Sequence, residues 1–262
     1  MQGRLSARSS QGAQVFPATW QKEFATASEL GFDAIEWLVE AGSLGENPLM
    51  TVSGREEIQQ AVADTGIRVV SVCAHCVLQW RPFDDGGVTR LKQFESVIMA
   101  AGAAGAKRVV VPILEEAAVT RAGSLAGAAA AFHPATRVAE AAGVDLAFEM
   151  DRPAEECREF VEKMNSPRAR LCYDSGNATA LGYDIVEEIN VLLPMVGEIH
   201  LKDRRVGGSS QPLGGGDTRF PEFFQTLKAR QWHGPFVLET PVLDDAVSQA
   251  RKNFDFARKF WP

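Results

Sequence analysis

The stretch VDLAFEMDRPAEECREFVEKMNSPRARLCYD, residues 144–174, contains one complete strand–helix–strand repeat. Its two ends are short apolar runs of the kind that buried parallel strands show, and the middle part, Ala154–Met164, has a helical pattern. Each apolar run is followed by an acidic residue, Glu149 after the first and Asp174 after the second. The stretch therefore predicts a βαβ unit in which each strand ends at a carboxylate.

The same alternation continues along the whole chain. The apolar runs that predict strands are Phe32–Trp37, Ile67–Cys73, Lys107–Ile113, Val144–Phe148, Ala169–Tyr173, Val196–Leu201 and Phe236–Glu239, with a short segment around Gln2–Leu5 as an eighth. The helical patterns are Trp20–Leu30, Glu56–Thr65, Thr89–Ala104, Leu125–Ala142, Ala154–Met164, Tyr183–Leu193, Pro221–Gln231 and Asp244–Phe260. Such alternation fits a closed parallel barrel or a large doubly wound sheet. The length of 262 residues favours a single (β/α)8 TIM barrel, with residues 1–262 as one domain.

Composition narrows the possible partners and compartments. The net charge is -7 and no basic stripe stands out, which argues against nucleic acid as a partner. No apolar run is long enough to cross a membrane and the first residues do not resemble a signal peptide, so we expect a cytoplasmic protein without a membrane partner. The four cysteines do not suggest a disulfide framework, and the single C-x-x-C, Cys73 to Cys76, is weak evidence for zinc or redox chemistry.

In a (β/α)8 barrel the functional residues lie at the carboxyl ends of the strands. Four consecutive predicted strands end at Glu149, Asp174, His200 and Glu239. Acidic residues that converge on one barrel mouth repel each other unless a cation lies between them. The sequence therefore predicts one divalent metal ion on these four residues, with Mn²⁺ as the first choice and Mg²⁺, Co²⁺ or Zn²⁺ as alternatives.

Three other strand ends carry ionisable side chains whose role is open. Glu36 can be functional or can cap the next segment, and Glu115 fits a solvated loop better than a site. His75 can contact substrate or can be an ordinary hydrogen-bonded histidine. Trp37 follows Glu36 directly, so it can stack against a sugar or can pack between helices. We carry Glu36, Trp37 and His75 forward as candidate substrate contacts.

The segments around the four predicted metal ligands resemble those of a known protein family. The segments AFEM (147–150), LCYDSGNA (171–178), GEIHLKDR (197–204) and FVLET (236–240) look like the sugar-phosphate isomerase/epimerase family. That family belongs to the xylose isomerase-like TIM barrels, which also include ketose 3-epimerases and endonuclease IV. The resemblance implies that Glu149, Asp174, His200 and Glu239 hold the metal and that the two glutamates are the catalytic acid/base pair. It also implies a small-molecule sugar or sugar-phosphate substrate and a homodimer or homotetramer.

The segments after the sixth and seventh predicted strands add further candidates. Lys202 and Arg204 follow His200 and can bind a substrate hydroxyl, carboxylate or phosphate, and Asn177 stands where the endonucleases carry a metal-binding histidine. The Gly/Ser-rich segment 206–216 is expected to be a loop, and its residues Gly214–Gly216 can offer backbone N–H groups to an anion.

Several activities remain open for such a site. The first is 3-epimerisation of a ketose by two-glutamate proton transfer through a metal-stabilised enediolate. An aldose–ketose isomerase of the hydroxypyruvate isomerase type and a dehydratase or lyase on a keto-inositol-like substrate need the same residues. A DNA-repair endonuclease fits less well, because Asn177 and Glu115 stand where histidine ligands are expected.

Overall fold

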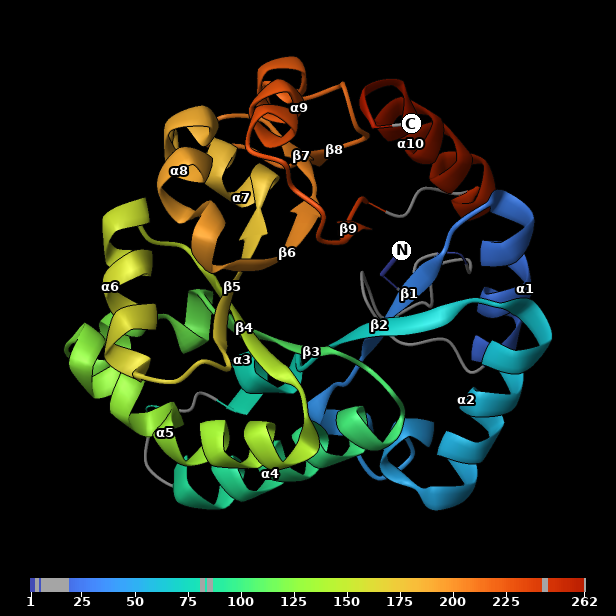
Figure 1. The fold of residues 1–262 in the computed structure, drawn as a ribbon, viewed down its shortest axis with the longest axis vertical. Helices are drawn as coiled ribbons and strands as arrows, with labels where there is room; N and C mark the ends of the chain where they lie inside the picture. Colours follow the sequence, from blue (N-terminus) through green and yellow to red (C-terminus); the bar gives the residue numbers. More distant parts are fainter. Residues whose placement is uncertain (3–4, 6–18, 81–82, 84–86, 242–244, 262) are drawn as a thin grey trace.

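The computed structural model describes residues 1–2, 5, 19–80, 83, 87–241 and 245–261. Within these residues, seven parallel strands form a nearly closed barrel in the order β1-β2-β3-β4-β5-β6-β9, surrounded by helices (Figure 1). The strands are β1 (Ala34–Leu38), β2 (Arg68–Cys73), β3 (Arg108–Ile113), β4 (Asp145–Met150), β5 (Ala169–Asp174), β6 (Val196–Leu201) and β9 (Phe236–Leu238). The predicted TIM-barrel class is confirmed.

The start of the chain lies between β9 and β1, where the barrel would otherwise be open. Gln2 pairs in parallel with Glu36 of β1, and the Glu36 N–H donates to the carbonyl of Met1 at 2.8 Å. On the other side, the Gln2 N–H donates to the carbonyl of Leu238 at 3.3 Å. The predicted eighth strand is therefore seen as one bridge, because its next two residues lie outside the described part of the chain.

Most helices lie close to the positions predicted from the sequence, whereas two short ones, at residues 76–80 and 175–180, were not predicted. Those in the described residues are α1 (Trp20–Leu30), α2 (Val52–Thr65), α3 (Cys76–Trp80), α4 (Gly87–Ala103), α5 (Leu125–Ala142), α6 (Ala154–Met164), α7 (Ser175–Ala180), α8 (Ile185–Leu192), α9 (Phe220–Ala229) and α10 (Ala246–Phe260). α1, α5 and α6 have the predicted bounds. α2 begins four residues before its predicted start, because the Thr51 hydroxyl accepts a hydrogen bond from the Gly54 N–H and caps the helix there.

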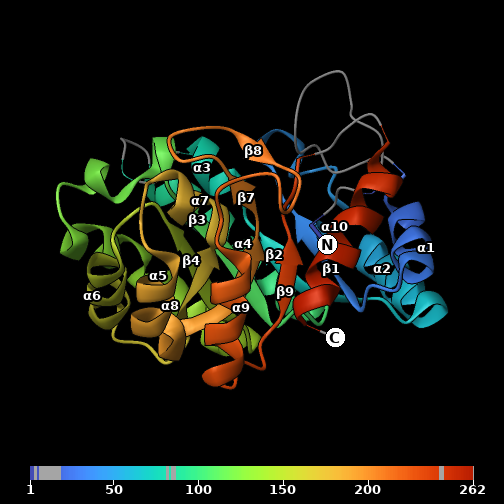
Figure 2. The ribbon, with the colours of Figure 1, turned by 90° about the horizontal axis from the view of Figure 1, so that it is seen from above.

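The ring of helices closes where the two ends of the chain meet. α10 lies beside α1 in both ribbon views (Figures 1 and 2). The Arg251 guanidinium donates to the carbonyl of Leu30 at 2.8 Å, and the rings of Phe254 and Phe32 are 4.7 Å apart. These contacts join helices that are more than 200 residues apart in sequence, so the last helix completes the outer layer.

The segment after β6 differs from the loop predicted for residues 206–216. β7 (Asp203–Arg204) and β8 (Ser210–Gln211) form a two-stranded antiparallel hairpin, and β8 lies within the predicted loop. The Gly207 N–H at the hairpin tip donates to the carbonyl of Ala180, the last residue of α7, at 2.8 Å. The prediction missed this hairpin because its strands are only two residues long and are polar.

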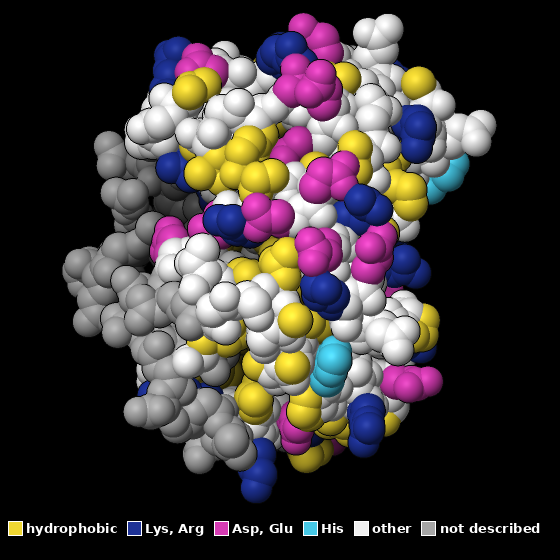
Figure 3. Space-filling view, turned by 90° about the vertical axis from the view of Figure 1, so that its left-hand side faces the viewer, with side chains coloured by type: hydrophobic (Ala, Val, Ile, Leu, Met, Phe, Trp, Pro, Cys, Tyr) yellow, Lys and Arg dark blue, Asp and Glu magenta, His cyan; other side chains and the backbone are white. Residues whose placement is uncertain are grey.

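The outer surface shows charges of both signs. On the face drawn in Figure 3, Lys and Arg side chains alternate with Asp and Glu, and hydrophobic side chains form small groups between them. In the part of the chain that the structure describes, no helix is both long and apolar enough to span a membrane.

Candidate active site

The four predicted metal ligands meet at one end of the barrel. Glu149 lies in β4, Asp174 ends β5, His200 lies in β6 and Glu239 directly follows β9. One possible ligand atom from each lies within 4.8 Å of those from the other three. All four are buried, with at most 6% of their surface exposed. The structure thus brings together four residues that span 91 positions of sequence, as the barrel topology requires. Their role as ligands stays a prediction.

Three carboxylates share this small volume, which affects their protonation. The pKa of Glu149 rises from its ordinary value of 4.5 to about 8, first because of burial and then because Glu239 and Asp174 carry like charges. Burial also raises the pKa of Asp174. The Lys202 ammonium lies 2.7 Å from Oε1 of Glu239 and 3.3 Å from Oδ2 of Asp174. A divalent cation between these carboxylates would favour their ionised forms and offset the repulsion that raises the pKa of Glu149.

The donor atoms fit a single divalent cation. Oδ1 of Asp174 accepts hydrogen bonds from the N–H groups of Gly176 and Asn177, at 2.8 and 2.7 Å, whereas its buried Oδ2 accepts none. Nδ1 of His200 lies 2.9 Å from Oε2 of Glu239, so these two atoms face the same small volume. Three carboxylates and one imidazole suit Mn²⁺, Mg²⁺, Co²⁺ or Zn²⁺.

A second set of polar side chains lies in the barrel interior on the other side of His200. Nε2 of His200 is 3.3 Å from Glu36 and 3.5 Å from Glu198, and the Ser71 hydroxyl is 2.8 Å from each of these two carboxyl groups. Gln2 donates to Glu36 at 2.8 Å. Glu36 was expected at the barrel mouth as a substrate contact, and that contact stays a prediction. Its side chain points into the barrel, and the residue is completely buried.

Ser71 shows that the two interior carboxyl groups differ in protonation. Its single hydroxyl hydrogen can be donated to only one of them, so the other contact requires a proton on a carboxyl group. Burial raises the pKa of Glu36, but the charge of His200 and its hydrogen bond outweigh this effect and lower the pKa to about 2. Burial, followed by the charge of Glu36, raises the pKa of Glu198 to about 7. Glu36 is therefore the ionised partner of His200.

Sequence reasoning missed Glu198 and Ser71. Glu198 lies two residues before His200 in β6, and side chains two apart in a strand point to the same face. An acidic residue at that spacing from a barrel-facing histidine was a usable signal. Ser71 carried no such signal, because a serine in an apolar strand is common.

Trp37, expected to line the pocket, points away from the barrel interior. It follows the inward-facing Glu36 and therefore lies on the opposite face of β1. Its Nε1–H donates to Oδ1 of Asn47 at 2.9 Å, and its ring packs edge-on against Trp20 at 5.2 Å. The residue is completely buried among these neighbours, so the prediction of a substrate contact is wrong.

His75 lies outside the group of four. It follows β2, and its Nδ1 is 3.9 Å from a carboxylate oxygen of Glu40, with 26% of the side chain exposed. Its contact with substrate stays a prediction. Glu115 begins a short 3-10 helix and is exposed, which agrees with the solvated interpretation. Cys73 and Cys76 are buried free thiols.

The remaining candidates, Lys202, Asn177 and Arg204, all make contacts with protein groups near the four residues. Lys202 pairs with Glu239 and Asp174 as described above. Nδ2 of Asn177 donates to Oε1 of Glu149 at 2.8 Å, and Nη1 of Arg204 donates to Oδ1 of Asn177 at 3.0 Å. Substrate contact by these residues stays a prediction.

The glycine-rich segment does not offer its N–H groups to a ligand. The N–H groups of Gly214, Gly216 and Thr218 all donate to the carboxylate of Asp203, at 2.8, 2.9 and 3.1 Å. Asp203 is completely buried, and a Cβ on Gly216 would clash with its Oδ1. The suggested anion site at Gly214–Gly216 is therefore wrong, because the chain's own carboxylate already occupies it.

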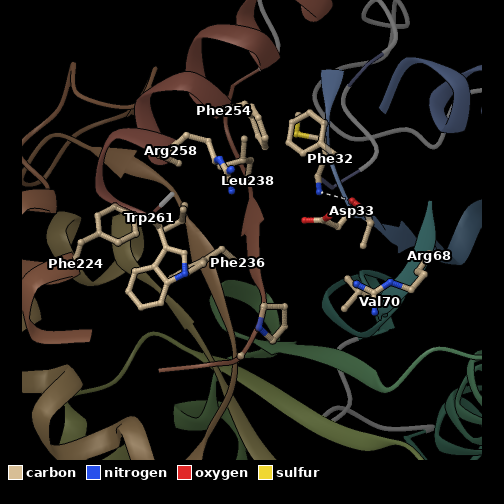
Figure 4. A pocket seen from close by; sticks show the side chains of 16 residues that line it. Phe32, Asp33, Arg68, Val70, Phe224, Phe236, Leu238, Phe254, Arg258 and Trp261 are labelled. Carbon is tan, nitrogen blue, oxygen red and sulfur yellow. Dashed lines mark hydrogen bonds between the residues drawn. The ribbon is translucent and has the colours of Figure 1, made fainter. Parts of the chain in front are cut away.

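A separate hollow lies beside the starting residues of β1, β2 and β9, at the other end of these strands from the site. Its volume is about 280 Å³. In Figure 4, Trp261, Phe236 and Phe224 lie on one side of it, and Asp33 and Arg68 on the other. None of the four predicted metal ligands lines this hollow.

The fold and the site together define a TIM barrel with carboxylates and a histidine gathered at the carboxyl ends of its strands. A family model described as "Xylose isomerase-like TIM barrel" matches residues 24–260. The chain belongs to this family, as its sequence motifs predicted.

Individual relatives extend the comparison. The chain is 30% identical to a 2-epi-5-epi-valiolone 7-phosphate 2-epimerase from an Actinoplanes species, over 89% of this chain and 87% of the relative. It is 27% identical to the L-ribulose-5-phosphate 3-epimerase UlaE of Salmonella heidelberg, over 91% of this chain and 89% of the relative. The solved structure of an L-ribulose 3-epimerase matches the fold with a TM-score of 0.78 at 16% identity, covering 99% of this chain and 93% of that one.

Proposed function

We propose that this protein is a metal-dependent ketose or ketose-phosphate 3-epimerase in which Glu149 and Glu239 transfer the proton. The observation that carries the proposal is the meeting of these two glutamates with Asp174 and His200, within 4.8 Å of one another. The curated relatives, at 25–30% identity, place the chain in the broader class of carbohydrate epimerases and isomerases.

The arrangement of strands supports proton transfer across the substrate. β4 and β9 are separated in the barrel by β5 and β6, so Glu149 and Glu239 approach the mouth from different sides, with Asp174 and His200 between them. One carboxylate removes the proton from the carbon next to the carbonyl, and the other returns a proton to the opposite face. A bound divalent metal would stabilise the negative charge that develops on the substrate oxygens.

Burial prepares the two glutamates differently for this task. Glu149 has its pKa raised to about 8 and receives a hydrogen bond from Asn177. Glu239 lies against the Lys202 ammonium and His200. Without metal, these contacts make Glu149 the more readily protonated of the two glutamates.

The names of the relatives indicate which class of substrate to test first. By their names, two of them are epimerases of phosphorylated compounds, one of 2-epi-5-epi-valiolone 7-phosphate and the other of L-ribulose 5-phosphate. A phosphorylated ketose is the first substrate to test. Mn²⁺ as the metal, the cytoplasmic location, the homodimer or homotetramer and the single domain stay predictions.

The test combines metal content with isotope exchange. The test uses wild type and two site variants, Glu149→Gln and Glu239→Gln. The control is Glu187→Gln, which changes an exposed residue of α8. Each protein is loaded with Mn²⁺ and incubated in D₂O with L-ribulose 5-phosphate and a panel of ketoses. We expect about one metal per wild-type chain and deuterium at C3, with both site variants slowed by about 10²-fold or more and the control unchanged. No metal binding, or turnover with the original hydrogen fully retained, would refute the proposal.

A further inference from the structure

We propose that Arg204 and Asn177 act as positioning residues, which hold the Glu149 carboxylate in place, and that neither is a substrate contact. This inference rests on the proposed function in that Glu149 is taken as a metal ligand and proton carrier. It assigns a task to two polar side chains that the sequence suggested for binding substrate.

A continuous chain of hydrogen bonds leads from the hairpin to Glu149. Nε and Nη2 of Arg204 both donate to the carbonyl of Gly208, at 3.1 and 2.8 Å. Nη1 of Arg204 donates to Oδ1 of Asn177 at 3.0 Å, and Nδ2 of Asn177 donates to Oε1 of Glu149 at 2.8 Å. Three N–H groups of the guanidinium are thus used on protein acceptors.

The direction of the Asn177 amide depends on Arg204. An amide has one accepting end and one donating end, and either can face a given neighbour. A guanidinium can only donate, so Oδ1 of Asn177 must face Arg204 and Nδ2 must face Glu149. A reversed amide would place its oxygen against the carboxylate of Glu149, where two acceptors repel. Arg204 therefore determines whether Asn177 stabilises or repels Glu149.

Backbone contacts hold both ends of this chain of hydrogen bonds. The Gly208 carbonyl belongs to a hairpin tip in which the Gly208 N–H donates to Arg205 and the Gly207 N–H donates to Ala180, each at 2.8 Å. Asn177 lies in the first turn of α7, where its own N–H is bound by Asp174 at 2.7 Å. Neither Arg204 nor Asn177 can therefore move far without breaking secondary structure.

The consequence for Glu149 is that its carboxylate is held in one orientation. Oε1 accepts the hydrogen bond from Asn177, which fixes the direction in which the remaining lone pairs of the carboxylate face the metal and the substrate. Outer residues that orient metal ligands in this way typically change metal affinity or activity by about 10–100-fold when they are removed.

A double-mutant cycle in metal affinity tests this proposal. The proteins are wild type, Arg204→Gln, Asn177→Ala and the double variant, with Mn²⁺ dissociation constants measured by calorimetry. Arg205→Gln is the matched control, because Arg205 is the next residue in the chain, its side chain is 57% exposed and it pairs with Asp217. Arg204→Lys is included because a lysine can still donate one hydrogen bond to Asn177.

We expect Arg204→Gln to weaken Mn²⁺ binding about 10-fold, the double variant to be no weaker than Asn177→Ala, and Arg204→Lys to restore part of the loss. The control should bind as wild type does. Fully additive losses in the cycle would overturn the proposal, because they would mean that Arg204 does not act through Asn177.

Steady-state kinetics give a second readout on the ketose that wild type turns over. Positioning predicts a lower kcat for Arg204→Gln with KM nearly unchanged. A large rise in KM at unchanged kcat would overturn the proposal in favour of a substrate contact. If wild type binds Mn²⁺ but turns over no ketose, the proposed function fails, while the cycle in Mn²⁺ affinity still decides the role of Arg204.

Discussion

Glu149 is the residue whose chemistry depends most on its surroundings. An isolated glutamate would be ionised at neutral pH, but burial and the charges of Glu239 and Asp174 bring its pKa to about 8. Lys202 favours the ionised form, yet it pairs with Glu239 and Asp174 rather than with Glu149. A side chain that can take up or lose a proton near neutral pH is what a proton-transferring enzyme needs.

The raised pKa of Glu149 predicts how stability depends on pH when metal is removed. Between pH 4.5 and about 8 the folded protein holds a proton on Glu149 that the unfolded chain has lost. The contribution of Glu149 to the free energy of unfolding is therefore fully present below pH 4.5 and is lost as the pH rises towards 8. We expect the free energy of unfolding, measured in urea with a chelator, to fall by on the order of 5 kcal/mol across this window.

Glu149→Gln provides the comparison for this prediction. Glutamine keeps the size of the side chain and does not titrate, so the variant should lose part of the pH dependence and be more stable than wild type at pH 8. Burial raises the pKa values of Glu188 and Glu198 to about 7. These two residues therefore make the free energy of unfolding depend on pH in the same way in both proteins. Identical pH profiles for the two proteins would contradict the assigned pKa of Glu149.

At the scale of elements, the β7–β8 hairpin is organised by one buried carboxylate. Asp203 accepts three backbone N–H groups from residues 214–218 and lies directly after Lys202. Its neighbour Arg204 reaches the site through Asn177. The hairpin therefore connects a structural carboxylate to the chemistry of the barrel mouth.

Asp203→Ala should release this segment. Three buried or half-buried N–H groups would lose their acceptor, and each such loss costs about 1–3 kcal/mol. We expect a lower melting temperature and increased hydrogen exchange in residues 205–218, measured by mass spectrometry, together with reduced activity. Asp217→Ala, on the exposed side of the same hairpin, should show much smaller effects, and equal effects in the two variants would refute the special role of Asp203.

At the scale of the whole molecule, the site joins distant parts of the chain. Its four residues come from β4, β5, β6 and the segment after β9, and none contacts the others until the barrel has closed. A metal that binds all four therefore binds the folded barrel and not the unfolded chain.

Metal binding should consequently stabilise the entire protein. At a free Mn²⁺ concentration of about 100 times the dissociation constant, linkage predicts an increase of about 2.7 kcal/mol in the free energy of unfolding. Thermal unfolding with and without Mn²⁺ measures this increase, and a single transition in both cases would agree with one domain. Glu239→Gln should remove most of the stabilisation, and an equal increase in that variant would contradict a site that includes Glu239.

Much of the fold could be predicted from the sequence because it depends on local patterns. Apolar runs and helical periods gave β6 and α1, α5 and α6 their observed bounds, and the topology of a parallel barrel then brought Glu149, Asp174, His200 and Glu239 together. The β7–β8 hairpin could not be predicted, because its two-residue strands are held by a buried aspartate rather than by an apolar pattern.

The sequence by itself determined the class of fold, the family and the four residues that meet at the barrel mouth, since these follow from periodicity and from the ends of strands. Only the tertiary structure decided which way the other candidates face. It directed Glu36 inward to His200, turned Trp37 outward to Asn47 and joined Arg204 to Asn177. The physical reason is that these orientations depend on partners distant in sequence, which become neighbours only when the barrel closes.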